Sequence, residues 1–300
     1  MSDNNTLRID NMNIAKRHAY MICAHKNQWQ LETLLQLMDI EANDLYLHID
    51  IKTKDLDFDR LKACVRKGRL FFTDRINVEW ARWSIVESTI ILLKAAMKNG
   101  PYAYYHLISG QDIPLMPISR INEIFDNSDP DINYVDFSEE AWSRKTVYLR
   151  MAYFDRLLGN EWFFSNKVLR TISWPIRKMR YFIRSISVKY WVGSAWFDIN
   201  QWLAEKIIEN EKWILRHFKT FQFPDESFLQ SLVLKLGIKN KCISPRRFLE
   251  WEYGSGVWRP HVFTMKDYDR VMEKAGDYIF ARKFDEEVDR EIIERFSRIC

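Results

Sequence analysis

The chain has 300 residues, of which 47% are apolar and 15% aromatic, and its net charge is +4. This apolar content supplies a substantial core and excludes an intrinsically disordered chain. The low counts of glycine (9) and proline (8) exclude collagen-like and low-complexity sequences. A net charge of +4, without an RNP or helix-turn-helix signature, argues against a nucleic-acid-binding protein.

The N-terminus and the cysteines bear on the compartment. Residues 1–17 form a polar tail without the apolar stretch of a signal peptide. No run of about 18 apolar residues is present to span a membrane. The cysteines form no CxxC pair, which favours a reducing compartment; they are Cys23, Cys64, Cys242 and Cys300. We expect a cytoplasmic protein, either free or peripheral on the inner face of the cell membrane.

Strand and helix patterns alternate in the first half of the chain. Four apolar runs predict strands, at residues 19–24, 45–50, 70–72 and 102–108, and the first of these is expected to be buried. Amphipathic patterns predict the intervening helices, at residues 30–38, 58–65 and 85–97. This alternation indicates an α/β fold with a mostly parallel sheet and helices on both faces. Ligands of such sheets bind beyond the carboxyl ends of strands, which here carry His25, Asp50 and the loop 109–112.

Helical patterns dominate the second half. They cover residues 197–218, a helix that starts at Pro224 or Asp225, and a mostly charged helix from Lys266 that is interrupted at residues 279–285. No segment between residues 19 and 298 has the composition of a flexible linker. We therefore expect a single domain over residues 18–300, with a nucleotide-binding half at about 18–137 and a helical acceptor and catalytic half at about 138–300.

Residues 166–191 concentrate positive charge, because they contain seven basic residues and no acidic one, interleaved with aromatic residues. Contact with an anionic membrane and an ordinary amphipathic surface explain this composition equally well. Nucleic-acid binding is the weaker third interpretation.

Acidic pairs and histidines give little support for a metal. The six histidines have no metal-ligand spacing. Asp-x-Asp pairs occur within residues 55–59 and at Asp129 and Asp131, and such a pair can hold a divalent cation on a diphosphate. The favoured interpretation is structural: Asp57 caps a helix, and Asp129 begins a turn.

Glu226 and three cations are the remaining candidates. Glu226 falls in the first turn of its predicted helix, where the helix dipole favours an ionised carboxylate that is able to act as a general base. Acidic residues also occur at helix starts for structural reasons alone. Arg259, Arg282 and Lys283 are able to neutralise a diphosphate without a metal, although a solvated helix face is the ordinary place for such residues.

Eight segments, read in order, resemble the core-2/I-branching N-acetylglucosaminyltransferase family, which includes the peptide O-xylosyltransferases. They span nearly the whole chain: AYMICAHKN (19–27), LYLHIDIK (45–52), WARWSIVES (80–88), YYHLISGQDIPL (104–115), GSAWFDI (193–199), FPDESFLQSLV (223–233), FLEW (248–251) and FARKFD (280–285). The resemblance implies a GT-A-like glycosyltransferase fold. It also implies inverting transfer of a sugar, N-acetylglucosamine or xylose, from a UDP-sugar to a hydroxyl of a glycan or glycoconjugate, with no metal or other cofactor.

The resemblance also implies roles for individual residues. Glu226, in the PDE motif, is the general base, and Lys283, in the FA-x-KF motif, contacts the diphosphate. The second cation is Arg259 or His261, because this chain reads WRPH at 258–261 where relatives read His-Pro-Lys or His-Pro-Arg. The remaining assignments are His25 and Asp50 for the uridine and Trp251 for the acceptor side.

The chain shows neither the N-terminal membrane anchor nor the paired cysteines of animal relatives, which favours a bacterial-type member. Its acceptor would then be a surface-polysaccharide or lipid-linked glycan intermediate, with residues 166–191 at the membrane. The alternative is a catalytically silent relative that binds UDP or a glycan. A glycosidase is disfavoured, because it needs a matched pair of carboxylates and the sequence singles out one.

Overall fold

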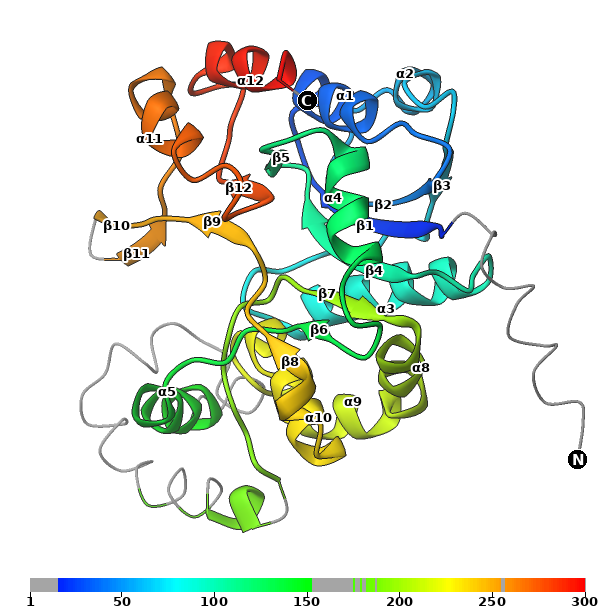
Figure 1. The fold of residues 1–300 in the computed structure, drawn as a ribbon. Coiled ribbons are helices and arrows are strands. Elements are labelled where there is room, and N and C mark those ends of the chain that lie inside the picture. The colour runs from blue at the N-terminus through cyan, green and yellow to red at the C-terminus, as the bar shows by residue number, and fades with distance from the viewer. Residues whose placement is uncertain are drawn as a thin grey trace, which may run out of the picture.

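A seven-stranded, mostly parallel sheet forms the centre of the molecule (Figure 1). The structure is a computed structural model that describes residues 16–152, 175, 179, 182–186, 188–254 and 257–299. The strand order is β3-β2-β1-β4-β7-β6-β8. The first four are parallel, β7 is antiparallel to its neighbours β4 and β6, and β8 is parallel to β6. Their bounds are β1 His18–Ala24, β2 Asn43–Ile49, β3 Arg69–Phe72, β4 Tyr104–Ser109, β6 Asn133–Tyr134, β7 Asp198–Asn200 and β8 Cys242–Ile243.

Helices cover both faces of this sheet, as the alternating pattern predicts. Alternate side chains of β1 enter two different cores: Tyr20 and Ile22 pack in one, and Ala19 and Met21 in the other. The first core also receives α1 (Gln28–Leu37), α2 (Phe58–Ala63) and α4 (Ile118–Asp126). The second receives α3 (Trp83–Met97), α5 (Glu140–Ala152), α8 (Gln201–Glu209), α9 (Glu211–Phe218) and α10 (Phe228–Leu236). The α/β fold with a mostly parallel, helix-covered sheet is therefore confirmed.

Two small sheets and two short helices complete the C-terminal part. A three-stranded sheet has the order β5-β12-β9, and β10 pairs with β11 in a ribbon. The bounds are β5 Ile113–Pro114, β9 Arg247–Leu249, β10 Trp251–Gly254, β11 Val257–Pro260, α11 Tyr268–Met272, β12 Phe280–Arg282 and α12 Arg290–Ser297. The predicted charged helical pattern from Lys266 corresponds to two short helices, α11 and α12, on either side of the predicted interruption. Its interruption is the buried strand β12, whose Ala281 packs into a third core with Phe284 of the following loop.

Two helix predictions need correction. The pattern at 197–218 begins with strand β7, which lies between β4 and β6 in the central sheet, and then divides into α8 and α9 at Asn210. Pro224–Glu226 forms a separate 3-10 turn, because Ser227, with φ −144° and ψ −29°, departs from helical geometry before α10 begins. Glu226 therefore ends a short turn instead of lying in the first turn of an α-helix.

A buried ion pair joins the small three-stranded sheet to the central sheet. Arg247 of β9 pairs with Asp198 of β7, and its guanidinium lies 4.8 Å from the centre of the Phe280 ring in β12. Asp198 also lies 2.8 Å from the Nδ1 atom of His106. Because removal of one partner leaves the other buried and uncompensated, this pair fixes β12, and the residues that follow it, against the central sheet.

None of the helices in the described ranges combines the length and apolar character that a bilayer span requires.

Candidate functional site

His25 and Asp50 lie together, as the sheet topology predicts. His25 follows β1 and Asp50 follows the adjacent parallel strand β2. The amide of Asp50 donates a hydrogen bond to the Ala24 carbonyl at 3.1 Å, and the Thr53 hydroxyl donates to the His25 carbonyl at 2.7 Å. These bonds hold the two loops side by side at the carboxyl edge of the sheet, where ligands of parallel sheets bind.

Lys283 follows β12 and belongs to the same edge. Its ammonium is half-buried and forms no ion pair with any carboxylate in the described ranges. Desolvation lowers its pKa, and the neighbouring cations Arg282 and Lys26 lower it further. Partial desolvation also lowers the pKa of His25, and the Lys283 ammonium is the next largest cause. An unpaired, partly desolvated ammonium among other cations is an arrangement that favours an anionic ligand.

Two further cations, Lys26 and Arg282, lie beside Lys283, and each is paired with a carboxylate. Lys26 pairs with Asp285 at 2.6 Å, across 259 positions of the chain. Arg282 pairs with buried Asp112 at 3.3 Å, and its guanidinium lies 4.1 Å from the centre of the Trp196 ring. The sequence named Arg282 among the candidate cations for a diphosphate, whereas the only signal for Lys26 was its position next to His25.

The two alternatives for a second diphosphate cation share one carboxylate. Arg259 donates to Glu252 at 2.9 Å, and the Nδ1 atom of His261 lies 2.9 Å from the other Glu252 oxygen. Hydrogen bonds to Glu252 and Asp267 raise the pKa of His261, against the opposing effect of desolvation. Arg259 is mostly exposed, and its charge contributes to the lowered pKa of Lys283. Arg259 is thus the alternative with a direct electrostatic influence on Lys283.

Glu226 lies at the other side of the site and is paired with Arg150. The Arg150 guanidinium, from α5, donates to the Glu226 carboxylate. The backbone of Glu226 is also fixed, because the amide of Gly193 donates to its carbonyl at 3.0 Å. Gly193 tolerates no larger residue there, since an added Cβ would lie 2.0 Å from the Asp136 carbonyl oxygen. Arg150 carries no recognisable motif, so sequence reasoning missed it.

The loop 193–197 joins the Glu226 side to the Lys283 side. Gly193 holds the Glu226 backbone, and Trp196 carries the guanidinium of Arg282, the residue before Lys283. The three-residue step from Gly193 to Trp196 spans at most roughly 10 Å. Residues from both sides also influence the pKa of the Cys23 thiol, near the end of β1. Burial raises its pKa to about 12, and Asp112, Arg282 and Asp225 all influence it. Asp225, which precedes Glu226, and Arg282, which precedes Lys283, therefore both lie near this end of β1.

Asp225, beside Glu226, holds its proton unusually strongly. Burial raises its pKa to about 7, and the Glu226 carboxylate adds to the effect. Two adjacent carboxylates resist simultaneous ionisation, so the charge of Glu226 favours the protonated form of Asp225.

Asparagine at position 225 is expected to change how stability depends on pH. The pKa of Asp225 in the folded state lies above its unfolded value of about 3.9. Its contribution to stability is thus fully present below about pH 4 and is lost as the pH rises through about 7. The free energy of unfolding of the wild type, relative to Asp225→Asn, should fall by a few kcal/mol between these limits. Urea unfolding of both proteins across this range measures it, and a constant difference would contradict the raised pKa.

Other predicted features have mixed outcomes. Asp57 caps α2 by accepting from the amides of Asp59 and Arg60, and Asp129 accepts from the Asp131 amide in a turn, so both structural interpretations are confirmed.

Trp251 is 53% exposed on β10, in the same ribbon as Arg259, and no described contact joins it to Glu226. Most of the basic segment 166–191 lies outside the described residues, so membrane contact there stays a prediction.

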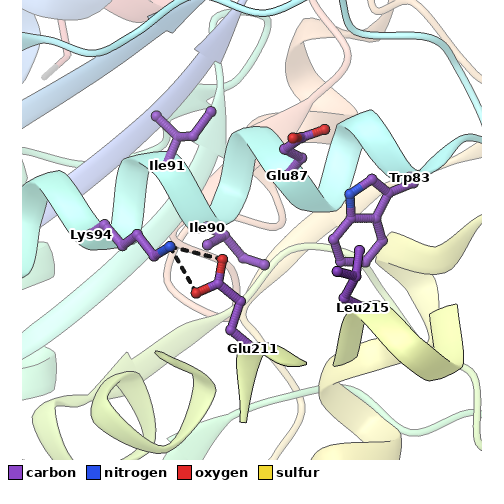
Figure 2. Close-up of a pocket in the computed structure, with 7 residues that line it drawn as sticks. All are labelled: Trp83, Glu87, Ile90, Ile91, Lys94, Glu211 and Leu215. Carbon is purple, nitrogen blue, oxygen red and sulfur yellow. Dashed lines mark hydrogen bonds and ion pairs between the residues drawn. The ribbon is translucent and has the colours of Figure 1, made fainter. Parts of the chain in front are cut away.

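A hollow lies along α3, away from the candidate site residues (Figure 2). It has a volume of about 220 Å³ and is crossed by the ion pair of Lys94 with Glu211 at 2.7 Å. Its lining residues are Trp83, Glu87, Ile90, Ile91, Lys94, Glu211 and Leu215. Its lining includes none of the site residues predicted from the sequence and none of the residues described at the end of β1.

Comparisons with known proteins give the family. A search of curated proteins found no significant match. Solved structures with a similar fold include mouse xyloside xylosyltransferase 1 in its apo form, with 10% identity, a TM-score of 0.39, and coverage of 88% of this chain and 96% of that chain. Core-mannan synthase A from Aspergillus fumigatus, in an Mn/GDP form, has 12% identity, a TM-score of 0.33, and coverage of 76% and 72% respectively. The family model described as Core-2/I-Branching enzyme matches residues 18–272. The chain therefore belongs to the Core-2/I-branching enzyme family, whose members are glycosyltransferases that move a sugar from a nucleotide-sugar donor to a glycan acceptor.

Proposed function

We propose that this glycosyltransferase inverts the anomeric centre and moves N-acetylglucosamine or xylose from a UDP-sugar to a hydroxyl group of a glycan, without a metal. The observation that supports the proposal is that Gly193 binds the Glu226 carbonyl while Trp196, three residues on, contacts the guanidinium of Arg282, the residue before Lys283. A single displacement needs a base for the attacking alcohol and positive charge for the leaving group. Glu226 and Lys283 supply both requirements.

Glu226 acts as the general base. Its carboxylate takes the proton of the acceptor hydroxyl while the hydroxyl oxygen forms a bond to C1 of the donor sugar. The bond from C1 to the diphosphate oxygen breaks, and its electron pair leaves with UDP. Arg150 orients the Glu226 carboxylate through their ion pair, and burial favours the protonated form of the neighbouring Asp225. Because the displacement occurs in one step, no second catalytic carboxylate is required.

Lys283 stabilises the charge that develops on the diphosphate, and Arg259 reinforces it. The half-buried ammonium of Lys283 has no carboxylate partner in the described part of the chain, so its charge is available to the diphosphate. A positive charge stabilises a developing negative charge more strongly in a partly desolvated site than in water. His25 and Asp50, at the adjacent strand ends, bind the uridine, and Trp251 lies on the acceptor side.

Release of UDP from a panel of UDP-sugars tests the proposal. Purified protein should release UDP from UDP-N-acetylglucosamine or UDP-xylose faster than from UDP-glucose or UDP-galactose, with or without an added acceptor. Binding of UDP without any turnover would instead favour a catalytically silent relative. Preferential use of a GDP-sugar would contradict the proposed donor. The surface-polysaccharide acceptor, the bacterial origin and the cytoplasmic location stay predictions from the sequence.

Chelation of divalent cations is expected to leave transfer unchanged. If Lys283 and Arg259 neutralise the leaving diphosphate, a saturating concentration of EDTA should change the initial rate by less than about twofold, and Mn²⁺ should not restore a lost activity. Initial rates of UDP release with EDTA, Mg²⁺ and Mn²⁺ measure this. An activity that disappears with EDTA and returns with Mn²⁺ would show that a metal carries the diphosphate charge.

A further inference from the structure

Trp80 is the most exposed of the large apolar side chains in the described ranges, with 79% of its surface accessible. A single exposed apolar residue is ordinary on a protein surface. The surroundings of Trp80 are not ordinary, because its indole contacts the turn that carries Glu226. Its ring meets the Phe223 ring edge to face, with centroids 4.9 Å apart. Phe223 directly precedes the Pro224–Glu226 turn.

The backbone fixes this contact from both sides. The amide of Phe223 donates to the Ala81 carbonyl at 3.1 Å, and the Arg82 amide donates to the Glu79 carbonyl at 3.2 Å, which closes a turn with Trp80 and Ala81 at its centre. Ala81 and Phe223 both adopt left-handed backbone conformations, with φ of 63° and 51°. Such conformations are costly for residues with a Cβ and persist only where the surroundings impose them. The turn thus presents the indole outward in a defined position beside Glu226.

A chain of contacts continues from Trp80 to the carboxylate. The Arg150 guanidinium lies 5.1 Å from the centre of the Phe223 ring and pairs with Glu226. The side chains of Phe223 and Arg150 therefore link the exposed indole to the base through successive contacts. The cations that suit a diphosphate are at the other end of the loop 193–197, beside Arg282. The exposed indole thus lies on the Glu226 side of the loop 193–197.

We propose that Trp80 is an acceptor-binding residue, and that its indole stacks on the apolar C–H face of the sugar ring whose hydroxyl Glu226 deprotonates. This inference rests on the proposed function and names the class of acceptor that the site takes, a pyranose glycoside. Indole provides a large, rigid surface with few rotatable bonds, so it stacks on a ring at a low cost in conformational entropy. Hydrogen bonds to Glu226 then select the hydroxyl that reacts.

The test compares Trp80→Ala, Trp80→Phe and a control, Trp202→Ala, which removes another exposed tryptophan on α8. The acceptors are p-nitrophenyl glycosides of galactose, xylose, glucose and N-acetylgalactosamine. Trp80→Ala should raise the acceptor KM about tenfold, which corresponds to the loss of one aromatic contact. Trp80→Phe should recover most of that loss, and Trp202→Ala should match the wild type. The donor KM and the rate of UDP release without acceptor should not change.

Two results would overturn the inference: an acceptor KM of Trp80→Ala within twofold of the wild type, or a rise in the donor KM instead. If no glycoside accepts a sugar, saturation-transfer NMR measures binding of the same glycosides. Signals with the wild type that Trp80→Ala lacks would support the inference, and equal signals, or none with either protein, would overturn it. Failure of the proposed function is a separate outcome, since it would appear as no UDP release by the wild type without acceptor.

Discussion

Replacement of Glu226 by glutamine is expected to lower the rate of sugar transfer by about 10²- to 10⁴-fold, the usual contribution of a general base. Glutamine has nearly the same shape but cannot take the proton of the acceptor hydroxyl. The affinity for UDP should be unchanged, because the cations proposed to bind the diphosphate follow or include Arg282, which contacts the other end of the loop 193–197. Initial rates of transfer and thermal shifts with UDP measure the two quantities.

The design must separate chemistry from folding, because Glu226 is paired with Arg150 and glutamine weakens that ion pair. Thermal melting of the free variant reports any loss of stability. Glu209→Gln, which removes an exposed carboxylate paired with Lys206 on α8, is the matched control and should retain full activity. Near-normal transfer by a folded Glu226→Gln variant would show that another group is the base.

Replacement of Lys283 by methionine is expected to lower kcat by about 10²- to 10³-fold, which is the typical cost of removing one preorganised group that stabilises transition-state charge. Methionine keeps the apolar stem in its half-buried position and removes only the ammonium. Affinity for UDP should also fall, whereas affinity for uridine should not. Lys283→Arg should recover part of the activity, since it retains the charge but not the compact shape of the ammonium.

Lys266→Met is the matched control for this variant, because it removes an exposed cation from the same C-terminal part of the chain. Steady-state kinetics with the preferred UDP-sugar, together with titrations of UDP and uridine, distinguish the effects. An unchanged kcat for Lys283→Met would assign the diphosphate charge to other cations, of which Arg282, Lys26 and Arg259 are the neighbours in the structure.

The strand ends of the site were predictable because their signals are local. Each buried strand is a short continuous apolar run, so the ends of β1 and β2 located His25 and Asp50 at one edge of the sheet. The capping role of Asp57 was equally predictable, since it depends on backbone amides only two and three residues away.

The partners of the site were not predictable, because they depend on pairs far apart in the sequence. Arg150 meets Glu226 across 76 positions, and Lys26 meets Asp285 across 259. The pairing of Arg282 with Asp112 requires β12 to lie beside β5, although the segment around β12 reads as an interruption in a charged helix. Local propensity also assigned Glu226 to an α-helix, whereas the backbone at Ser227 ends the turn first. In each case tertiary packing decided the outcome.

Calorimetric titration of UDP in the presence of EDTA tests most directly whether fixed cations hold the nucleotide independently of the base. The proteins are the wild type, Glu226→Gln and Lys283→Met. The mechanism predicts that the wild type and Glu226→Gln bind UDP with the same affinity, and that Lys283→Met binds it at least about tenfold more weakly, a loss of about 1.4 kcal/mol. Binding by the wild type only after Mn²⁺ is added, or equal affinities for all three proteins, would contradict it.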